Sequence, residues 1–228
     1  MIIYDSMQFN VFFKPMPDIR KHSFKFEEDL KEYFPLSFNI LPIPDNAPFE
    51  VPRIIGASPN QHSNIQISAN MIQLSVLFDK EFSNDENKCY AYTKIRIERL
   101  LKVLENLSCE ILFMGLITQC VENGVDKPRD FIRKTFFNLK TSNELFDVAT
   151  KATFVSDEQY YVNIELTNLR NDKGGESLGI VLDVNNRYIM NFGKNNKDEN
   201  PLEKILLLHS RILKEKINDF ISKGELSI

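Results

Sequence analysis

The sequence has few residues of the kinds that form metal centres and disulfide frameworks. Its three cysteines, Cys89, Cys109 and Cys120, are odd in number, and none belongs to a Cys-x-x-Cys pair. This spacing supports neither a set of disulfides nor a zinc site. We therefore expect free, buried thiols in a reducing compartment, with no metal and no cofactor.

Long apolar runs are also missing. The longest extends only from Ile111 to Ile117, whereas a helix that spans a membrane needs about 20 residues. The opening MIIYDSMQFN lacks the basic start and the apolar stretch of a signal peptide. These two absences predict a soluble, cytoplasmic protein with no membrane partner.

An excess of positive charge is absent as well. The formal net charge is −4, and binding to phosphate backbones usually depends on a basic excess. This balance argues against a nucleic-acid partner. Hydrophobic residues make up 43% of the chain and charged residues 26%, so the chain can bury a core of the ordinary globular kind.

Alternating apolar and polar residues predict strands in the first half. The alternation occurs in four segments: residues 8–14, 36–40, 65–69 and 72–78. The apolar parity switches between Ala69 and Ile72, which predicts a turn at Asn70 and Met71. Residues 53–56 are expected to form a further short edge strand, and covering such an edge by a homodimer is one common solution.

Two helices are expected in the same half. Ser23 is predicted to cap a short helix that continues through EEDLKEYF to Phe34. A longer helix is predicted over residues 86–107, because Ile97, Leu100 and Leu104 follow the helical spacing.

The second half repeats this order of elements. A long strand over residues 109–123 precedes a short helix over residues 127–138, in which Pro128 suits the first turn. Further strands are predicted at residues 145–155, 160–169 and 179–190, with a hairpin loop at 171–179. After a polar loop at 193–200, a closing helix begins at Asn200 and Pro201 and ends at Gly224.

Both halves thus consist of a strand, a short helix, several antiparallel strands and a long helix. Few helices interrupt many strands, which is typical of the α+β class. We predict an α+β fold of two pseudo-repeated halves, residues 1–107 and 108–228. Each half has a size that can fold alone, and the two could equally form one continuous domain.

Part of the second half resembles a known family. The strand GIVLDV at residues 179–184 is followed by a closing helix with LLLHSRILKEKINDF at residues 206–220. These segments, together with the strand ANMIQLSVLFD at residues 69–79 and the helix after it, resemble the sporadically distributed family of uncharacterised bacterial proteins, and the likeness covers residues 60–223. The N-terminal segment departs from the family pattern. The resemblance implies no assigned activity, and a sporadic distribution suits a mobile defence or toxin–antitoxin setting.

Two histidines and one aspartate are candidate ligand-binding residues. His209 lies beside the apolar stripe of the closing helix, either as a switch or ligand or as a partly buried histidine bonded to a neighbouring strand or loop. Asp183 is costly to bury unless paired, but it faces solvent if Leu182 and Val184 point inward. His62 lies in the polar loop SPNQHSN, which either binds a polar ligand or forms a turn.

Charged clusters have two interpretations each. The acidic cluster Asp79, Glu81, Asp85 and Glu86 precedes the long helix, where such residues more often complement the helix N-terminus than bind a metal. Basic residues gather on the short helix of the second half near three phenylalanines, and could bind nucleic acid as a basic and aromatic surface or form an ordinary solvated face. These basic residues are Lys127, Arg129, Arg133 and Lys134.

No catalytic motif is visible. Gly174 and Gly175 lack the frame of a phosphate-binding loop, and neither a Gly-x-Ser-x-Gly nor a His-Glu-x-x-His pattern occurs. The sequence therefore favours a non-catalytic binding or adaptor protein of bacterial type with another protein as its partner. Two alternatives are a nucleic-acid-binding protein that uses a curved antiparallel sheet, and an enzyme whose site is assembled only in the fold from His62, His209 and Asp183.

Overall fold

The computed structural model describes residues 2–137, 140, 141, 143, 145–157, 159–187 and 200–225. It confirms the α+β class, with one antiparallel sheet in the order β2-β3-β4-β5-β1-β6-β9-β8-β7. The chain divides into two compact units: unit 1 comprises Met1–Asp5 and Leu116–Ile228, and unit 2 comprises Ser6–Gly115. Strands β1 (Ile2–Phe13) and β6 (Ile111–Glu122) each contribute residues to both units.

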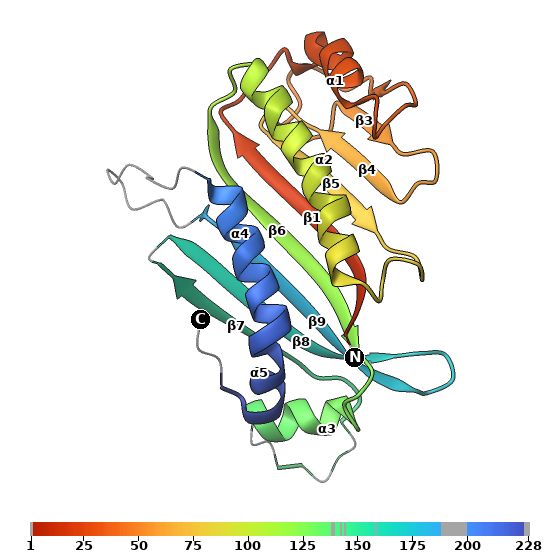
Figure 1. The fold of residues 1–228 in the computed structure, drawn as a ribbon, viewed down its shortest axis with the longest axis vertical. Helices are drawn as coiled ribbons and strands as arrows, with labels where there is room; N and C mark the ends of the chain where they lie inside the picture. Colours follow the sequence, from red (N-terminus) through yellow and green to blue (C-terminus); the bar gives the residue numbers. More distant parts are fainter. Residues whose placement is uncertain are drawn as a thin grey trace. The chain divides into compact units, whose positions relative to one another are not determined.

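In the sheet of unit 2, the strands from β2 to β5 pair in succession and β1 pairs with β5, all of them antiparallel (Figure 1). Its strands after β1 are β2 (Asn39–Ile40), β3 (Ile54–Ala57), β4 (Ser63–Ile67) and β5 (Met71–Leu77). The turn predicted after Ala69 is confirmed, and Ser68 N donates to Met71 O at 2.9 Å there. The expected edge position of residues 53–56 is wrong, because β2 pairs with β3 on its outer side.

Two strands of unit 2 differ in length from their predictions. Strand β1 begins at Ile2 rather than at Gln8. The sequence pattern missed this extension because Tyr4 and Met7 are both buried, so the alternation breaks between them. The strand predicted over residues 36–40 shrinks to β2, since Leu36 is half exposed while the Phe38 ring packs against Gly56. In both places the packing of single side chains overrides the period of two.

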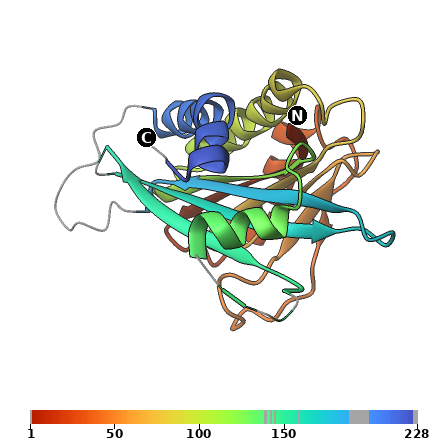
Figure 2. The same cartoon turned by 90° about the horizontal axis from the view of Figure 1, so that it is seen from below.

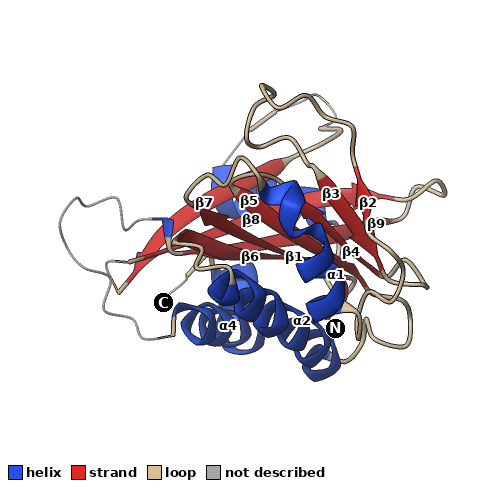
Figure 3. Ribbon diagram, turned by 90° about the horizontal axis from the view of Figure 1, so that it is seen from above, coloured by secondary structure: helices blue, strands red, loops and turns tan. Residues whose placement is uncertain are grey.

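The helices of unit 2 are α1 (Ser23–Leu30) and α2 (Glu86–Asn106). The cap predicted at Ser23 is wrong: Ser23 lies inside α1, because the 3₁₀ turn η1 (Ile19–His22) leads directly into it. The prediction of α2 is confirmed, and the Asp85 carboxylate accepts a hydrogen bond from Lys88 N at 3.1 Å as its N-cap. Figure 3 shows α2 on one side of the strands of unit 2.

The sheet of unit 1 contains β6, β9 (Glu176–Asn185), β8 (Tyr160–Arg170) and β7 (Ala149–Ser156), in that order. Strand β9 begins earlier than predicted, so the hairpin loop contains only residues 171–175. The Asn171 side chain closes this loop by accepting from Gly175 N at 2.8 Å, and Gly174 has a φ of +77°. The predicted continuation of the strand is wrong at Asn186 and Arg187, because β9 ends at Asn185, while residues 188–190 and most of the loop at 193–200 lie outside the described residues.

The helices of unit 1 are α3 (Pro128–Ile132), α4 (Pro201–Arg211) and α5 (Ile217–Lys223). The predicted start of the closing helix is confirmed, since the Asn200 side chain accepts from Glu203 N at 3.2 Å, and so is its end at Gly224, whose φ is +70°. Instead of one regular helix, however, a π-helical turn at Ile212–Lys216 joins α4 to α5. Another, at Arg133–Phe137, continues α3. Figure 2 shows α4 and α5, in blue, on one side of β8 and β9.

This arrangement confirms the predicted element order in both halves. Each long helix covers one face of its own sheet: Ser63 Oγ of β4 lies 3.5 Å from the Tyr92 hydroxyl of α2, and Phe220 of α5 packs against Phe154 of β7. The opposite sheet faces carry the outward side chains.

Candidate functional site

His209 is completely buried between α4 and β6 in unit 1. Its Nε2 lies 2.6 Å from the carbonyl oxygen of Leu116, and its Nδ1 lies 3.3 Å from Thr118 Oγ1. Burial lowers the pKa of the imidazole from 6.5 to about 4, against the opposing effect of the hydrogen bond with Leu116. The ring is therefore neutral at physiological pH, and both of its nitrogens are engaged inside the protein.

Asp183 points outward from β9, on the face opposite to the buried side chains of Leu182 and Val184. Asn163 Nδ2 on the paired strand β8 donates to its carboxylate at 3.0 Å, and Asn185 Nδ2 donates at 3.1 Å. Partial burial raises the pKa of the Asp183 carboxyl, while these two amides oppose the rise. The carboxylate is thus part of a cross-strand network on the outward face of the sheet.

His62 lies in unit 2, just before β4. Its Nε2 is 3.8 Å from Asp79 Oδ2, at the weak limit of an ion pair. The other carboxylate oxygen of Asp79 accepts from Glu81 N at 2.9 Å. The nearby hydroxyl of Ser58 donates to Asn60 instead of to His62. The pair therefore lacks a positioned nucleophile among the described residues, as a hydrolytic triad would need.

Two members of the acidic cluster before α2 accept hydrogen bonds from backbone N–H groups. Asp79 closes the turn that precedes the helix, and Asp85 caps the helix. Within the described ranges, no group of three or more histidine, cysteine or acidic side chains is placed to hold a metal ion.

The basic residues of the short helix are engaged with neighbours. Arg129 Nε lies 3.9 Å from the carboxylate of Glu176, and Arg129 also donates to Leu145 O. Arg133 pairs with Asp130 at 3.5 Å, within the same helical segment. The predicted nucleic-acid surface of Lys127, Arg129, Arg133 and Lys134 thus contains two arginines that already have anionic partners.

Two of the three phenylalanines of this segment point toward other rings, whereas Phe137 is 48% exposed. Phe131 contacts Phe136 at a centroid distance of 6.0 Å, and Phe136 contacts Phe220 of α5 at 5.2 Å. A stacking platform for bases needs exposed ring faces beside the basic groups. These contacts instead attach the short helix to α5.

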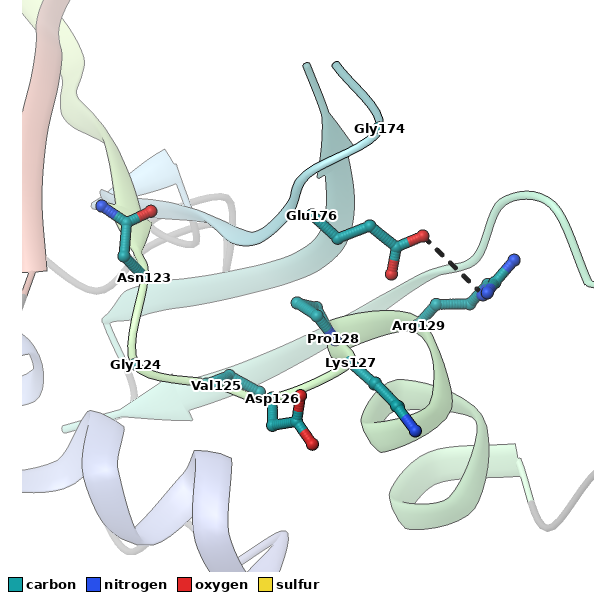
Figure 4. Close-up of a pocket in the computed structure, with 9 residues that line it drawn as sticks. All are labelled: Asn123, Gly124, Val125, Asp126, Lys127, Pro128, Arg129, Gly174 and Glu176. Atoms are coloured by element: carbon teal, nitrogen blue, oxygen red, sulfur yellow. Dashed lines mark ion pairs between the residues drawn. The ribbon is translucent and has the colours of Figure 1, made fainter. Parts of the chain in front are cut away.

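A polar pocket of about 610 Å³ lies between the β6–α3 loop and the β8–β9 hairpin of unit 1 (Figure 4). Lys127, at its wall, has a left-handed backbone with a φ of +47°, which is uncommon for a residue with a side chain. In Figure 4 the side chains diverge: Lys127 and Asp126 point away from Glu176, which faces Arg129. Glu176 also accepts from Arg170 Nε at 3.0 Å, so its charge is already matched. The pocket offers no convergent set of groups for one ligand.

The outward face of the unit 2 sheet contains no charged residue. We call this surface the amide face. The cross-strand register assigns to it the side chains Asn39, Ile55, Ala57, Asn64, Gln66, Met71, Gln73, Ser75, Leu77, Ser6, Gln8, Asn10 and Phe12. Gln73 lies near its centre, opposite Asn10 on β1 and Gln66 on β4.

The amides of this face bond along their own strands. Gln8 Nε2 lies 3.2 Å from Asn10 Oδ1, and Gln73 Nε2 lies 3.1 Å from Ser75 Oγ. At one end, Phe12 stacks on Phe113 of β6 with a centroid distance of 4.2 Å. The result is a half-exposed surface of neutral donors, neutral acceptors and apolar groups.

Sequence reasoning did not single out the amide face. The signal was present in the polar members of each alternating strand, such as Gln8, Asn10, Gln66 and Gln73. Each is unremarkable alone, because a polar residue is expected at every second position of a half-buried strand. Only the strand order shows that all of them share one face.

No family model matches the sequence, and no curated protein matches it. Among the described helices, none is both long enough and apolar enough to cross a membrane.

Proposed function

We propose that the protein is a non-catalytic binding protein, and that the amide face of unit 2 is the surface that engages another protein. The single observation that carries this proposal is the absence of charge from every outward position of the β1–β5 sheet of this unit. One quarter of the whole chain is charged, and a sheet face whose only role is to meet water commonly carries a share of that charge.

The chemistry of the amide face matches that of a protein interface. Burying a charge costs free energy unless it is paired, so the centres of interfaces are depleted of charged residues and enriched in aromatic residues and methionine. Here Phe12, Phe113 and Met71 lie at one end of a neutral polar surface. A partner that covered this face would therefore desolvate no ion.

The same chemistry makes nucleic acid the less favoured partner. Non-specific affinity for DNA and RNA comes mostly from lysine and arginine at phosphates, and the amide face has neither. The overall charge of −4 acts in the same direction. Binding of nucleic acid by a curved sheet is therefore the alternative that the charge substitutions distinguish.

Charge substitution at the centre of the face tests the proposal. In Gln73→Lys and Gln73→Glu, a charge would be buried against a neutral partner, so we expect both variants to lose capture of the same protein. Capture is measured with a photo-crosslinking residue at Ser75, followed by mass spectrometry of proteins from the source organism. Asn106→Lys and Asn106→Glu, at the exposed end of α2, are the matched controls and should capture normally.

The direction in which each added charge changes binding distinguishes a protein partner from a nucleic acid. If Gln73→Lys strengthens and Gln73→Glu weakens retention of nucleic acid in a gel shift, the partner is a polyanion and the proposal is wrong. It is also wrong if all four variants capture the same protein as the unmodified chain.

As cellular context we propose a cytoplasmic bacterial protein in a mobile defence or toxin–antitoxin setting, which rests on the family resemblance alone.

A further inference from the structure

Strand β7 forms the edge of the sheet in unit 1. It pairs with β8 through a continuous antiparallel register from Ala149↔Thr167 to Ser156↔Tyr160, and among the described residues no strand pairs with its other side. An edge of this kind presents backbone N–H and C=O groups that lack a partner strand.

The hydrogen-bond pattern shows which backbone groups face outward. Asn168 N donates to Val148 O, and on the other side of β8, Asn171 N donates to Gly175 O. Bonded pairs alternate along an antiparallel ladder. The even residues of β7 therefore bond to β8, and the odd residues Lys151, Thr153 and Val155 direct their N–H and C=O groups to the free edge.

This edge has few of the features by which proteins prevent edge pairing. Protected edges commonly carry proline, a bulge or several charges. Strand β7 reads ATKATFVS, with Lys151 as its only charge and no proline. Its register contains no bulge. In addition, Thr150, Ala152 and Phe154 are only partly buried, although their β8 partners Leu166, Ile164 and Val162 are fully buried. The core is thus incomplete along this strand.

We propose that β7 pairs with β7 of a second copy of this chain, antiparallel across a two-fold axis at Thr153. This inference is independent of the proposed function, because it concerns unit 1 and needs no other protein. With the axis at Thr153, the outward backbone groups of Thr153 face each other, and those of Lys151 face those of Val155 in the second copy.

The side chains of β7 complement one another in this register. On the face covered by α5, Phe154 lies opposite Ala152 of the second copy, so a large side chain meets a small one on both sides of the axis, and Thr150 lies opposite Ser156. On the other face, Thr153 lies opposite Thr153, a favourable cross-strand pair. Lys151 lies opposite the neutral Val155, which avoids a like-charge pair. An axis at Lys151 would instead place two lysines together.

Cysteine crosslinking tests the axis. In Thr153→Cys, the two Cα atoms would lie about 5.5 Å apart, within the range of a disulfide, so mild oxidation should give a covalent dimer on a non-reducing gel. Ala149→Cys is the control, because its two copies would lie about 27 Å apart, and it should remain monomeric. Equal crosslinking of both variants, or of neither, overturns the proposal.

Charge substitution at Val155 gives a second measurement that needs no covalent bond. Val155→Lys places one lysine opposite Lys151 of the other copy at each of two symmetry-related positions, and Val155→Glu places a carboxylate opposite that lysine at both. We expect the dimer dissociation constant from sedimentation velocity to rise about two- to thirty-fold in the first variant and to fall by a similar factor in the second. A monomer at the highest soluble concentration, or a shift in the same direction for both variants, overturns the pairing.

Discussion

The Nε2 atom of His209 lies 2.6 Å from the carbonyl oxygen of Leu116. A carbonyl can only accept a hydrogen bond, so Nε2 carries the proton of the neutral ring. Nδ1 is then an acceptor, and the Thr118 hydroxyl donates to it. The buried histidine thus joins α4 to β6 through one fixed tautomer, and protonation of Nδ1 would place an uncompensated charge in the core and require the Thr118 hydroxyl to turn and accept.

Acid should therefore destabilise the protein through His209. Its folded pKa of about 4 lies below the ordinary 6.5, so its contribution is fully present above pH 6.5 and is lost as the pH falls toward 4. The loss amounts to up to about 3 kcal/mol of unfolding free energy. Urea unfolding between pH 7 and 4 should show this slope, and His209→Gln should flatten it. His22→Gln, in the 3₁₀ turn of unit 2, is the control and should keep it. An unchanged slope in His209→Gln would contradict the assignment.

The thiols should be slow to react in the folded protein. Burial, together with the nearby charge of Asp85, raises the pKa of Cys89 from 9.0 to about 12, which lowers its thiolate fraction about a thousandfold at pH 8. Cys109 is only partly buried, although burial raises its pKa too. We expect an aromatic disulfide reagent to modify Cys109 first, and guanidinium to release all three thiols. Rapid labelling of Cys89 under native conditions, located by peptide mass mapping, would disagree.

Gly56 should not tolerate a side chain. A Cβ there would lie 2.6 Å from Cε1 of Phe38, far inside contact distance. We expect Gly56→Ala to lower the unfolding free energy by about 1–3 kcal/mol, as overpacking does. Phe38→Leu removes the ring that causes the clash, so the double variant should lose less than the sum of the single variants. Strict additivity in chemical denaturation would show that the clash is not the cause.

Arg53 should be needed for local order more than for global stability. Its side chain is 2% exposed, and its guanidinium donates to Pro44 O at 3.4 Å and Ala47 O at 3.1 Å. Arg53→Met keeps most of the apolar stem and removes the cost of burying a cation. We expect a change in unfolding free energy below about 1.5 kcal/mol, but faster proteolysis between Pro44 and Phe49. Arg20→Met, which removes the other arginine that donates to this loop, at Ile43 O, provides a comparison. Unaltered cleavage in Arg53→Met would argue against this role.

Local signals were sufficient for the elements that depend on neighbours in sequence. The caps at Asp85 and Asn200, the stop at Gly224 and the apolar stripe of α2 all act within a few residues, and the sequence identified the closing helix and α2 from the stripe and from the signals at Asn200 and Gly224. Ser23 carried the same kind of signal, but the preceding 3₁₀ turn placed it inside the helix. The π-helical turn between α4 and α5 leaves the apolar stripe intact, so the pattern did not reveal it.

The candidate sites depended on partners that are distant in the chain. Asp183 bonds to Asn163 through the pairing of β9 with β8, and Arg129 contacts Glu176 because α3 packs against β9. No local sequence pattern specifies either contact. The outward position of Asp183 was nevertheless predictable from the period of two around Leu182. The neutral character of the amide face needed the strand order, because its residues come from five strands.

The alternating ladder of β8 has a consequence for hydrogen exchange. Every second amide of β8 bonds to β7, and the amides between them bond to β9, so the whole strand should retain its protons longest in deuterated water. In β7 only the even amides share that protection. In a monomer, the odd amides of β7 would exchange at nearly the rate of an unfolded chain. Exchange rates that alternate from one residue of β7 to the next would therefore indicate a monomer, and uniformly slow rates would indicate that a second strand lies beside it.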